Sequence, residues 1–357
     1  MSVSDYATVH ARVRVMVAGL LTPAILEELA SAPDLGALVR TLKRTVYAPT
    51  LDGLDENALT PRRVVYQLKS RLGRDYASLI QAVPSQARKL LMQLYRRFEV
   101  DNLKAVLRGI ASGSSWERVR FVLFPLGSFT LLPAQEMLEA GNIPAAVELL
   151  SRTPYYNTLT HAMERYNAEG SLFPLEVSLD LNNWRTLWEE TNRLSGRDRE
   201  QGMRIVGSLT DMTNLMWAVR YRVYHHLAEE EIINYTLPFG NQVRDEEIRA
   251  IAAGADISQS VKRIYPDLPD LQDALQDPQS GLPKLEILLQ SRVADECRAA
   301  FLGYPFHIGI PLAYLILNEL EIQDLTVLIE AKDARIPVEG FRAYLLAGTS
   351  TGEGLPA

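Results

Sequence analysis

Cysteine is almost absent from this sequence of 357 residues, in which Cys297 is the one example. A single cysteine excludes a framework of internal disulfides. The N-terminal stretch also lacks the basic segment, apolar core and small-residue cleavage site that together mark a secretory signal peptide. We therefore expect a cytoplasmic protein.

Long apolar runs are scarce too. The window closest to a membrane span, residues 301–320, has about the required length but contains Pro305 and Pro311 and continues directly into Glu319 and the residues after it. This composition predicts a buried loop followed by a helix, with Pro311 in the first turn, where a missing N–H has no cost. We expect no direct transmembrane span.

The sequence motifs of nucleotide and metal chemistry are missing as well. No G-x-x-x-x-G-K-[ST] or G-x-G-x-x-G segment is present to cradle phosphates, and no H-E-x-x-H or Cys/His cluster is present to bind zinc. His225 and His226 are adjacent, so on a helix they point about 100° apart, and we predict a surface pair. His307 is predicted to be a core histidine and Cys297 a packed thiol. We predict no catalytic residue, no cofactor and no metal.

Basic residues become rare in the last third of the sequence. Residues 229–357 contain 21 Asp and Glu against 10 Lys and Arg, whereas residues 1–228 contain 23 against 27. Because nucleic-acid binding requires a continuous basic surface, we expect no nucleic-acid partner. The acidic third fits either a docking face for basic partners or an ordinary solvated face.

The sequence does contain one pattern three times. Asn102, Asn214 and Asp324 occupy the same place in it, with spacings of 112 (214 − 102) and 110 (324 − 214). Three units of about 111 residues nearly fill the chain. The three segments are FEVDNLKAVLRG at 98–109, MTNLMWAVRYR at 212–222 and EIQDLTVLIEAK at 321–332.

Independent landmarks recur in the same phase. Tyr47, Tyr155 and Tyr265 each end a pair of short apolar-periodic segments, and their spacings are 108 (155 − 47) and 110 (265 − 155). The segments LFPLG at 123–127 and LPFG at 237–240 follow the first two motifs at matching distances. Agreement between separate landmarks indicates a true internal repeat rather than a chance match.

The apolar spacing is helical throughout. Val100, Leu103 and Leu107 fall at i, i+3 and i+7, on one face of a helix, and similar spacing occurs at 84–98 and 178–194. We predict an all-α fold. Because a period of about 111 residues is too long for a solenoid of two-helix units, each repeat is predicted to be a small helical domain. The predicted repeats are residues 1–115, 116–228 and 229–357.

Each motif places an acidic residue three positions before an amide or a second carboxylate, on the same face of a helix. One interpretation is a polar lining in which the three motifs converge on a common axis, as in a socket. The other is a set of buried inter-helix links, in which each side chain satisfies a neighbouring helix end. Both assign an architectural role rather than a catalytic one. The candidate residues are Glu99, Asn102, Asp211, Asn214, Glu321 and Asp324.

These segments resemble the C subunit of the V-type and archaeal-type rotary ATPases, which is known as the d subunit in eukaryotes. The resemblance rests on the motif at 98–109, on ARVRVMVAGLL at 11–21, and on the longer stretches at 208–240 and 305–345, so it spans essentially the whole chain. The third motif of the family usually reads E-x-E-I-x-N-L-R. Glu319, Glu321 and Ile322 agree with this pattern, whereas Asp324 replaces the amide and Thr326 replaces the arginine.

The resemblance implies a funnel of three similar helical domains around a pseudo-threefold axis. Its narrow end is expected to rest on the cytoplasmic loops of the membrane proteolipid ring, and its cavity to accept the central-stalk subunits of D and F type. It implies a non-catalytic rotor subunit, peripheral on the cytoplasmic face of the membrane, that transmits torque while other subunits carry out the ATP chemistry.

Two other functions remain open from the residues alone. A helical scaffold or adaptor of an unrelated complex shares the repeats but not the specific segment at 305–345. An all-α enzyme using carboxylates such as Asp211 needs a base and an orienting partner, which the sequence does not supply.

Overall fold

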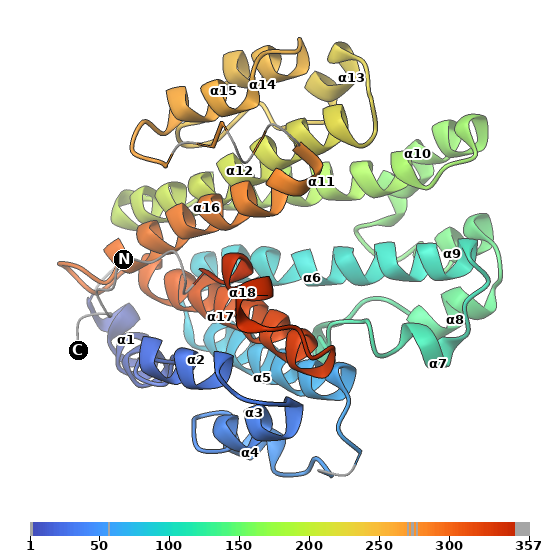
Figure 1. The fold of residues 1–357 in the computed structure, drawn as a ribbon. Helices are drawn as coiled ribbons and strands as arrows, with labels where there is room; N and C mark the ends of the chain where they lie inside the picture. The colour runs from blue at the N-terminus through green and yellow to red at the C-terminus, as the bar shows by residue number, and fades with distance from the viewer. Residues whose placement is uncertain (1–2, 56–57, 270, 273–274, 276–277, 347–357) are drawn as a thin grey trace.

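The computed structural model in Figure 1 describes residues 3–55, 58–269, 271–272, 275 and 278–346. Within these residues the chain forms helices, turns and irregular connections and contains no strand. The predicted all-α class is confirmed. None of the helices described is both long enough and apolar enough to cross a membrane.

Six helices of 20 residues or more form the framework. Consecutive long helices contact each other in three pairs, α5–α6, α11–α12 and α16–α17. The second helix of each pair also packs against the first helix of another pair: α6 on α11, α12 on α16 and α17 on α5. The contacts therefore close into a ring. The helices are α5 (Pro61–Ala82), α6 (Ser85–Ala111), α11 (Phe173–Asn192), α12 (Gly196–Val223), α16 (Pro278–Ala299) and α17 (Gly309–Asp333).

Short helices follow α6 and α12 in the chain and pack on them. In Figure 1 the two sets lie on different sides of the long helices, α7–α9 to the right and α13–α15 at the top. The first set is α7 (Trp116–Val119), η2 (Gly127–Phe129), α8 (Ala134–Glu139) and α9 (Ile143–Glu148), followed by α10 (Tyr156–Glu169). The second set is α13 (Glu229–Asn234), α14 (Asp245–Ala252) and α15 (Ile257–Ile264).

The helix α17 obtains its short helices from both ends of the chain. It contacts α18, which follows it, and α3 from the N-terminal region, with α2 packed on α3 and α4 between α3 and α5. The helix α1, which has no counterpart in the other two sets, packs on α17 and α5. These elements are α1 (Val3–Val17), α2 (Pro23–Ala30), α3 (Leu35–Leu42), α4 (Ala48–Leu51), α18 (Val338–Phe341) and η3 (Arg342–Tyr344).

This arrangement bears on how the chain is divided. The division into residues 1–115, 116–228 and 229–357 stays a prediction. From the contacts we propose a different structural unit, in which each of α6, α12 and α17 is grouped with the short helices packed on it. In that grouping the N-terminal region completes the unit of α17, and the ring of long helices is closed by contacts between distant parts of the sequence.

Local sequence signals explain where equivalent short helices begin. Asp34, Asn142 and Asp256 each accept a hydrogen bond from the backbone N–H three residues later, at 2.8, 2.9 and 2.7 Å, and so cap α3, α9 and α15. A cap of this kind stabilises a helix by about 1 kcal/mol. The same type of start signal therefore recurs at one equivalent helix in each set.

The buried apolar side chains form two clusters. The larger cluster joins the N-terminal helices to α5, α11, α12, α16 and α17, and the smaller one joins the C-terminal half of α6 to α7–α10 and the start of α11. The predicted helix within 301–320 is confirmed, because α17 begins at Gly309 with Pro311 in its first turn. The predicted buried loop is wrong in its first part, where Leu302 is 65% and Tyr304 44% exposed, and only His307 and Ile308 before the helix are buried.

Candidate functional site

The two repeated amides hold the loops that follow their helices. Asn102 on α6 donates to the backbone oxygen of Phe124 at 2.8 Å and accepts from its N–H at 2.7 Å. Asn214 on α12 makes the same pair of bonds with Leu237, at 2.9 and 2.8 Å. Both amides are buried. The recurring segments LFPLG and LPFG are therefore the loops that these amides fix to the long helices.

Asp324 occupies the same place on α17 with different chemistry. Its Oδ1 accepts from the N–H of Leu346 at 2.8 Å, and the sequence separation of 22 matches that from Asn102 to Phe124. An ionised carboxylate only accepts hydrogen bonds. The bond that an amide donates to a backbone oxygen is therefore unavailable to Asp324.

The repeated acidic residues bind backbone N–H groups in the same way. Asp211 is buried, and its carboxylate accepts from Asn241, Gln242 and Val243 at 2.8, 2.7 and 3.2 Å. A Cβ on Gly240 collides with this carboxylate, which explains the glycine that ends LPFG. These three N–H donors satisfy most of the acceptor capacity of the buried carboxylate, so Asp211 acts as an acceptor within the fold.

Glu99 and Glu321 complete the pattern. The buried Glu99 accepts from the N–H of Leu131 and, at 2.6 Å, from Arg96. The partly buried Glu321 accepts from the N–H of Leu21 at 2.6 Å. Each of the three acidic residues therefore anchors the backbone ahead of a pair of short helices.

The repeated tyrosines bind these same carboxylates. Tyr155 donates to Glu99 at 2.5 Å and Tyr47 to Glu321 at 2.6 Å, and Tyr265 lies 3.4 Å from Asp211. Two sets of sequence landmarks, the tyrosines and the acidic residues, are thus two halves of one recurring contact. Burial raises the pKa of all three tyrosines, and the facing carboxylate adds to the effect.

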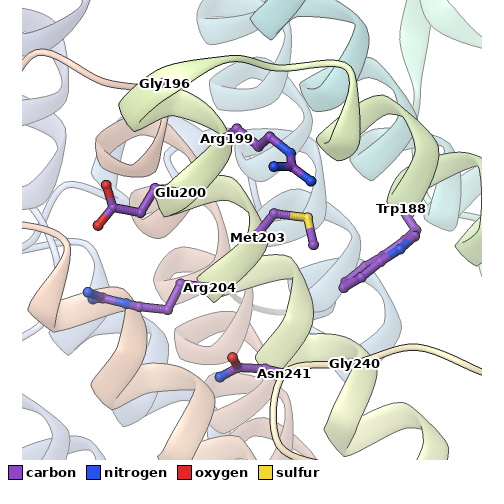
Figure 2. Close-up of a pocket in the computed structure, with 8 residues that line it drawn as sticks. All are labelled: Trp188, Gly196, Arg199, Glu200, Met203, Arg204, Gly240 and Asn241. Carbon is purple, nitrogen blue, oxygen red and sulfur yellow. The ribbon is translucent and has the colours of Figure 1, made fainter.

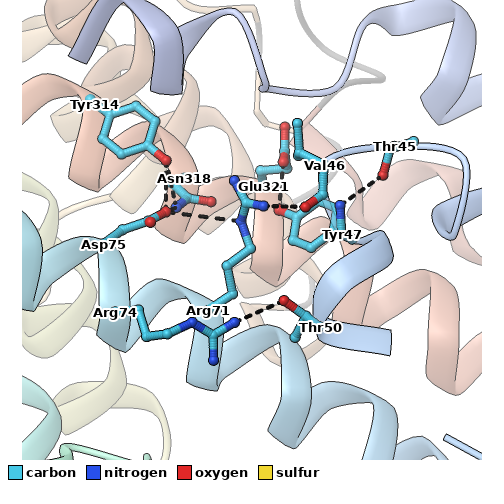
Figure 3. A network of polar contacts seen from close by, with 10 residues as sticks. All are labelled: Thr45, Val46, Tyr47, Thr50, Arg71, Arg74, Asp75, Tyr314, Asn318 and Glu321. Atoms are coloured by element: carbon cyan, nitrogen blue, oxygen red, sulfur yellow. Dashed lines mark hydrogen bonds and ion pairs between the residues drawn. The ribbon is translucent and has the colours of Figure 1, made fainter. Parts of the chain in front are cut away.

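The pairing of Tyr47 with Glu321 closes the chain on itself. Tyr155 follows Glu99 at a sequence separation of 56, whereas Tyr47 precedes Glu321 at a separation of 274. Figure 3 shows the network around this contact, in which side chains of α5 bind both α17 and the segment that contains Tyr47. Asp75 of α5 accepts from Tyr314 at 2.8 Å and from Asn318 at 2.9 Å, both on α17.

Two other side chains of α5 bind the N-terminal segment on either side of Tyr47. Arg71 donates to the backbone oxygen of Val46, and Arg74 donates to the Thr50 hydroxyl at 2.9 Å. One helix of the first pair therefore holds both α17 and the residues beside Tyr47.

Burial shifts the pKa of these acidic groups upward. Desolvation raises the pKa of Glu321 from its ordinary 4.5 to about 7, although the bonds from Tyr47 and Leu21 act in the opposite direction. The pKa of Asp211 rises to about 6 for the same reason, opposed by its three backbone donors. Burial also raises the pKa of Asp75.

Side-chain pairs also connect neighbouring helix pairs of the ring. Between α6 and α11, Lys104 lies 2.7 Å from Asp180, and Arg108 makes a two-pronged bond to Glu176. Between α12 and α16, Arg220 lies 2.7 Å from Glu286, and between α6 and α17, Arg97 lies 2.9 Å from Glu319. The Asp180 carboxyl is partly buried, and this desolvation raises its pKa to about 6. Sequence reasoning missed Asp75, Asp180 and the Arg97–Glu319 pair because they differ from one helix pair to the next.

The structure therefore brings the predicted site residues together in pairs, not in one place. We call Glu99, Asn102, Asp211, Asn214, Glu321 and Asp324 the link residues. Each acidic link residue shares a helix with its amide or carboxylate partner. The first two pairs hold the segment that follows their helix, whereas Glu321 holds Leu21 and Asp324 holds Leu346.

A surface pocket of about 630 Å³ lies beside the first turns of α12. Figure 2 shows Arg199 and Met203 directed toward Trp188, whereas Arg204 points away from it toward α16. There its guanidinium lies 2.7 Å from the Glu296 carboxylate. This mixture of apolar area and paired charge suits contact with another protein better than a reaction.

The remaining candidates for chemistry are accounted for. Cys297 is buried and burial raises its pKa, so the predicted packed thiol is confirmed. His225 and His226 are exposed, as predicted for a surface pair. The expectation that they lie on a helix is wrong, because α12 ends at Val223 and His226 has a positive φ of 50°. No group of three or more metal-ligating side chains occurs among the residues that the structure places.

Comparison with known proteins gives a consistent picture. The family described as ATP synthase (C/AC39) subunit matches residues 9–344. The chain is similar to the C subunit of the A-type ATP synthase of Methanocaldococcus jannaschii, with 23% identity over 97% of this chain and 88% of the relative. The corresponding C subunit of Methanothermobacter thermautotrophicus is 25% identical over 92% of this chain and 84% of the relative. That of Haloferax volcanii is 24% identical, covering 87% and 88%.

Proposed function

The chain belongs to the ATP synthase (C/AC39) subunit family and is therefore a subunit of a rotary ATPase, and we propose that it is a non-catalytic rotor subunit. In this proposal it forms a socket that couples the central stalk to the membrane proteolipid ring and transmits torque between them. Synthesis or hydrolysis of ATP then takes place in other subunits.

The observation that carries this proposal is the closed ring of six long helices with link residues recurring on α6, α12 and α17. A torque-transmitting part must resist deformation. Close packing and satisfied buried polar contacts both oppose relative movement of helices. Because each loop is bound to a long helix through its backbone, a load applied to the loops passes directly to the ring.

The partners and location follow as further parts of the proposal. We propose central-stalk subunits of D and F type and the proteolipid ring as partners, with the chain peripheral on the cytoplasmic face of the membrane. The curated relatives are named as C subunits of A-type ATP synthases, which supports this placement. The pocket beside α12, with its apolar and paired charged lining, adds a surface suited to a protein partner.

We also propose that the link residues are inter-helix links rather than the lining that meets the stalk. Glu99, Asp211 and Asn214 are each 1% exposed, so a partner has no access to them. Their bonds go to backbone groups within the chain, which is where a link is needed. Alanine substitution is then expected to lower stability more than it lowers partner binding.

Affinity purification from gently solubilised native membranes tests the role. The tagged chain is expected to recover proteolipid, central-stalk and catalytic subunits together, as identified by mass spectrometry, and untagged membranes serve as the control. Recovery of the chain with unrelated soluble proteins would favour the helical scaffold instead.

A further inference from the structure

Equivalent positions at the junctions between helix pairs carry different charges. Lys69 on α5, Asp180 on α11 and Gln290 on α16 follow the period of the repeat, with spacings of 111 (180 − 69) and 110 (290 − 180). The local neighbours agree with this alignment. Gln290 donates to Gln323 at 3.1 Å, at a sequence separation of 33, and Lys69 faces the charge of Asp101 at a separation of 32 (101 − 69). The same position is thus basic, acidic and neutral in turn.

One of these charges is paired across its junction and another is not. Between α6 and α11, Asp180 accepts from Lys104 at 2.7 Å. The residue of α17 equivalent to Lys104 is Thr326, because 326 − 104 equals 324 − 102, and Thr326 has no charge to offer Lys69. With the residues that the structure describes, the Lys69 ammonium makes no hydrogen bond and no ion pair within 4.0 Å. Partial burial lowers its pKa, opposed by the charge of Asp101.

Lys69 and Thr326 both line a cavity of about 550 Å³ that lies between α5, α6 and α17 and is open to solvent. We call it the junction cavity. Apolar side chains form much of its wall: Leu72, Phe98, Phe124 and Ile322, with Phe98 stacked on Phe124 at 4.0 Å. Val122, also in the lining, is 57% exposed. The volume lies within the range of roughly 300–1,000 Å³ that is usual for binding pockets.

The other charged residues of the junction cavity each already take part in an ion pair. Asp101 lies 2.9 Å from Lys104, Arg108 is bound to Glu176, and Glu319 lies 2.9 Å from Arg97. Among the described lining residues, Lys69 is therefore the cation that makes no ion pair within 4.0 Å, although the charge of Asp101 reaches it and Lys104 is shared by Asp101 and Asp180. A partner that enters gains most when it places an anion at Lys69 and apolar groups against Val122 and the aromatic pair.

We propose that the junction cavity is a docking site for an acidic amphipathic segment of a neighbouring protein subunit, with an Asp or Glu of that segment paired to Lys69. A protein segment fits better than a free anion such as phosphate, because the exposed Val122 and the apolar wall require an apolar surface to cover them. The proposal rests on the proposed function, in which the chain is embedded among other subunits of a rotary ATPase.

Zero-length carbodiimide crosslinking of the assembled complex tests the pairing directly. The reagent joins an amine to a carboxylate as an amide with loss of water, so a Lys69 crosslink to an Asp or Glu of another subunit is expected by mass spectrometry. Crosslinks from Lys69 only to residues of its own chain in an intact complex would overturn the junction site and leave the proposed function standing. Failure of the unmodified chain to assemble would instead count against the proposed function.

Substitution gives an independent test with a matched control. Lys69→Met is expected to weaken assembly by about tenfold and Lys69→Glu by more, because the latter places like charges together. Lys89→Glu makes the same charge change at an exposed residue of α6 outside the junction cavity and is expected to leave assembly unchanged. Equal effects of Lys69→Glu and Lys89→Glu would contradict the proposal.

A third experiment tests whether the junction cavity binds a small anion instead of a protein segment. In the isolated chain, inorganic phosphate at millimolar concentration is expected to leave acetylation of Lys69 unchanged. Protection of Lys69 by phosphate alone would overturn the protein-segment proposal.

Discussion

The contacts of Asp211 and of Glu321 are alike in chemistry but differ in how the chain connects them. Asp211 binds backbone N–H groups at sequence separations of 30 to 32, whereas Glu321 binds Leu21 at a separation of 300. Loop-closure entropy grows with the logarithm of the separation, so a loop about tenfold longer costs about 2 kcal/mol more to close. The same contact thus makes a local link in one region and joins the two ends of the chain in the other.

The comparison shows that equivalent side chains can have unequal consequences when they are lost. Removing Asp211 leaves buried donors without partners in a segment that the neighbouring chain still holds in place. Removing Glu321 also removes a direct bond between α17 and the N-terminal segment. The remaining contacts of that segment with α17 run through α3 and through α5. The predictions below change one contact at a time.

The largest effect on stability is expected for Asp211→Ala. Three backbone N–H groups lose their acceptor in a buried site, which is expected to lower the free energy of unfolding by about 4 kcal/mol. Denaturant unfolding followed by circular dichroism measures it. Asp211→Asn keeps one acceptor oxygen and is expected to cost less, and the exposed Asp52→Ala serves as the surface control. Equal stability of all three variants would contradict the link role.

Glu321→Ala is expected to cost about 3 kcal/mol, because the Leu21 N–H and the Tyr47 hydroxyl both lose their acceptor. This variant is expected to differ from Asp211→Ala in where the chain opens: limited proteolysis is expected to cleave it first within residues 20–51. Tyr47→Phe, which removes one of the two bonds, is the matched partial variant. Cleavage that begins near Asn241 in Glu321→Ala would contradict the account.

The pH dependence of stability is expected to distinguish Glu321 next. Its pKa is raised from 4.5 to about 7 in the folded chain, so the folded state binds the proton more tightly than the unfolded state. This contribution to stability is complete below about pH 4.5 and is lost as the pH rises through about 7. Denaturant titrations across that window are expected to show a steeper fall with rising pH for the wild type than for Glu321→Gln, which does not titrate. Identical slopes would argue against this shift.

The smallest effect is expected for Asp324→Asn, which gives the third link the amide of the first two. An amide can both accept from Leu346 and donate, and it removes a negative charge whose presence raises the pKa of Glu321. The expected gain in the free energy of unfolding is about 1 kcal/mol. Asn102→Asp makes the reverse change on α6 and is expected to lose stability, and a gain there would show that the loops do not require a donor.

The sequence allowed much of this architecture to be predicted. The period of the repeat, the helical spacing, the tyrosines and the six link residues are all visible as patterns, because each rests on local periodicity or on equal spacing. The partner of Glu321 is not visible in this way, since nothing in the order of residues says that the third motif pairs with the first tyrosine. Asp75, Asp180 and Lys69 were missed because each junction uses different side chains, and a search for repeats finds only residues that recur.

The helical ends were also harder to predict than the helices. His225 and His226 continue an apparently helical stretch, yet α12 stops at Val223, and no glycine or proline occurs between Val223 and Leu227 to signal the end. The stop is set instead by the backbone, which turns at the positive φ of His226. The following helix α13 also contacts α12, a contact that the order of residues does not show.

The central claim is that Glu321 holds the N-terminal region onto α17 and so joins the two ends of the chain. Hydrogen–deuterium exchange with mass spectrometry on the full-length wild type, Glu321→Ala and Asp211→Ala tests it most directly. The account predicts that Glu321→Ala raises exchange in residues 20–51, far away in sequence, whereas Asp211→Ala raises exchange in residues 237–265. Faster exchange confined to α17 in Glu321→Ala, with residues 20–51 unchanged, would contradict it.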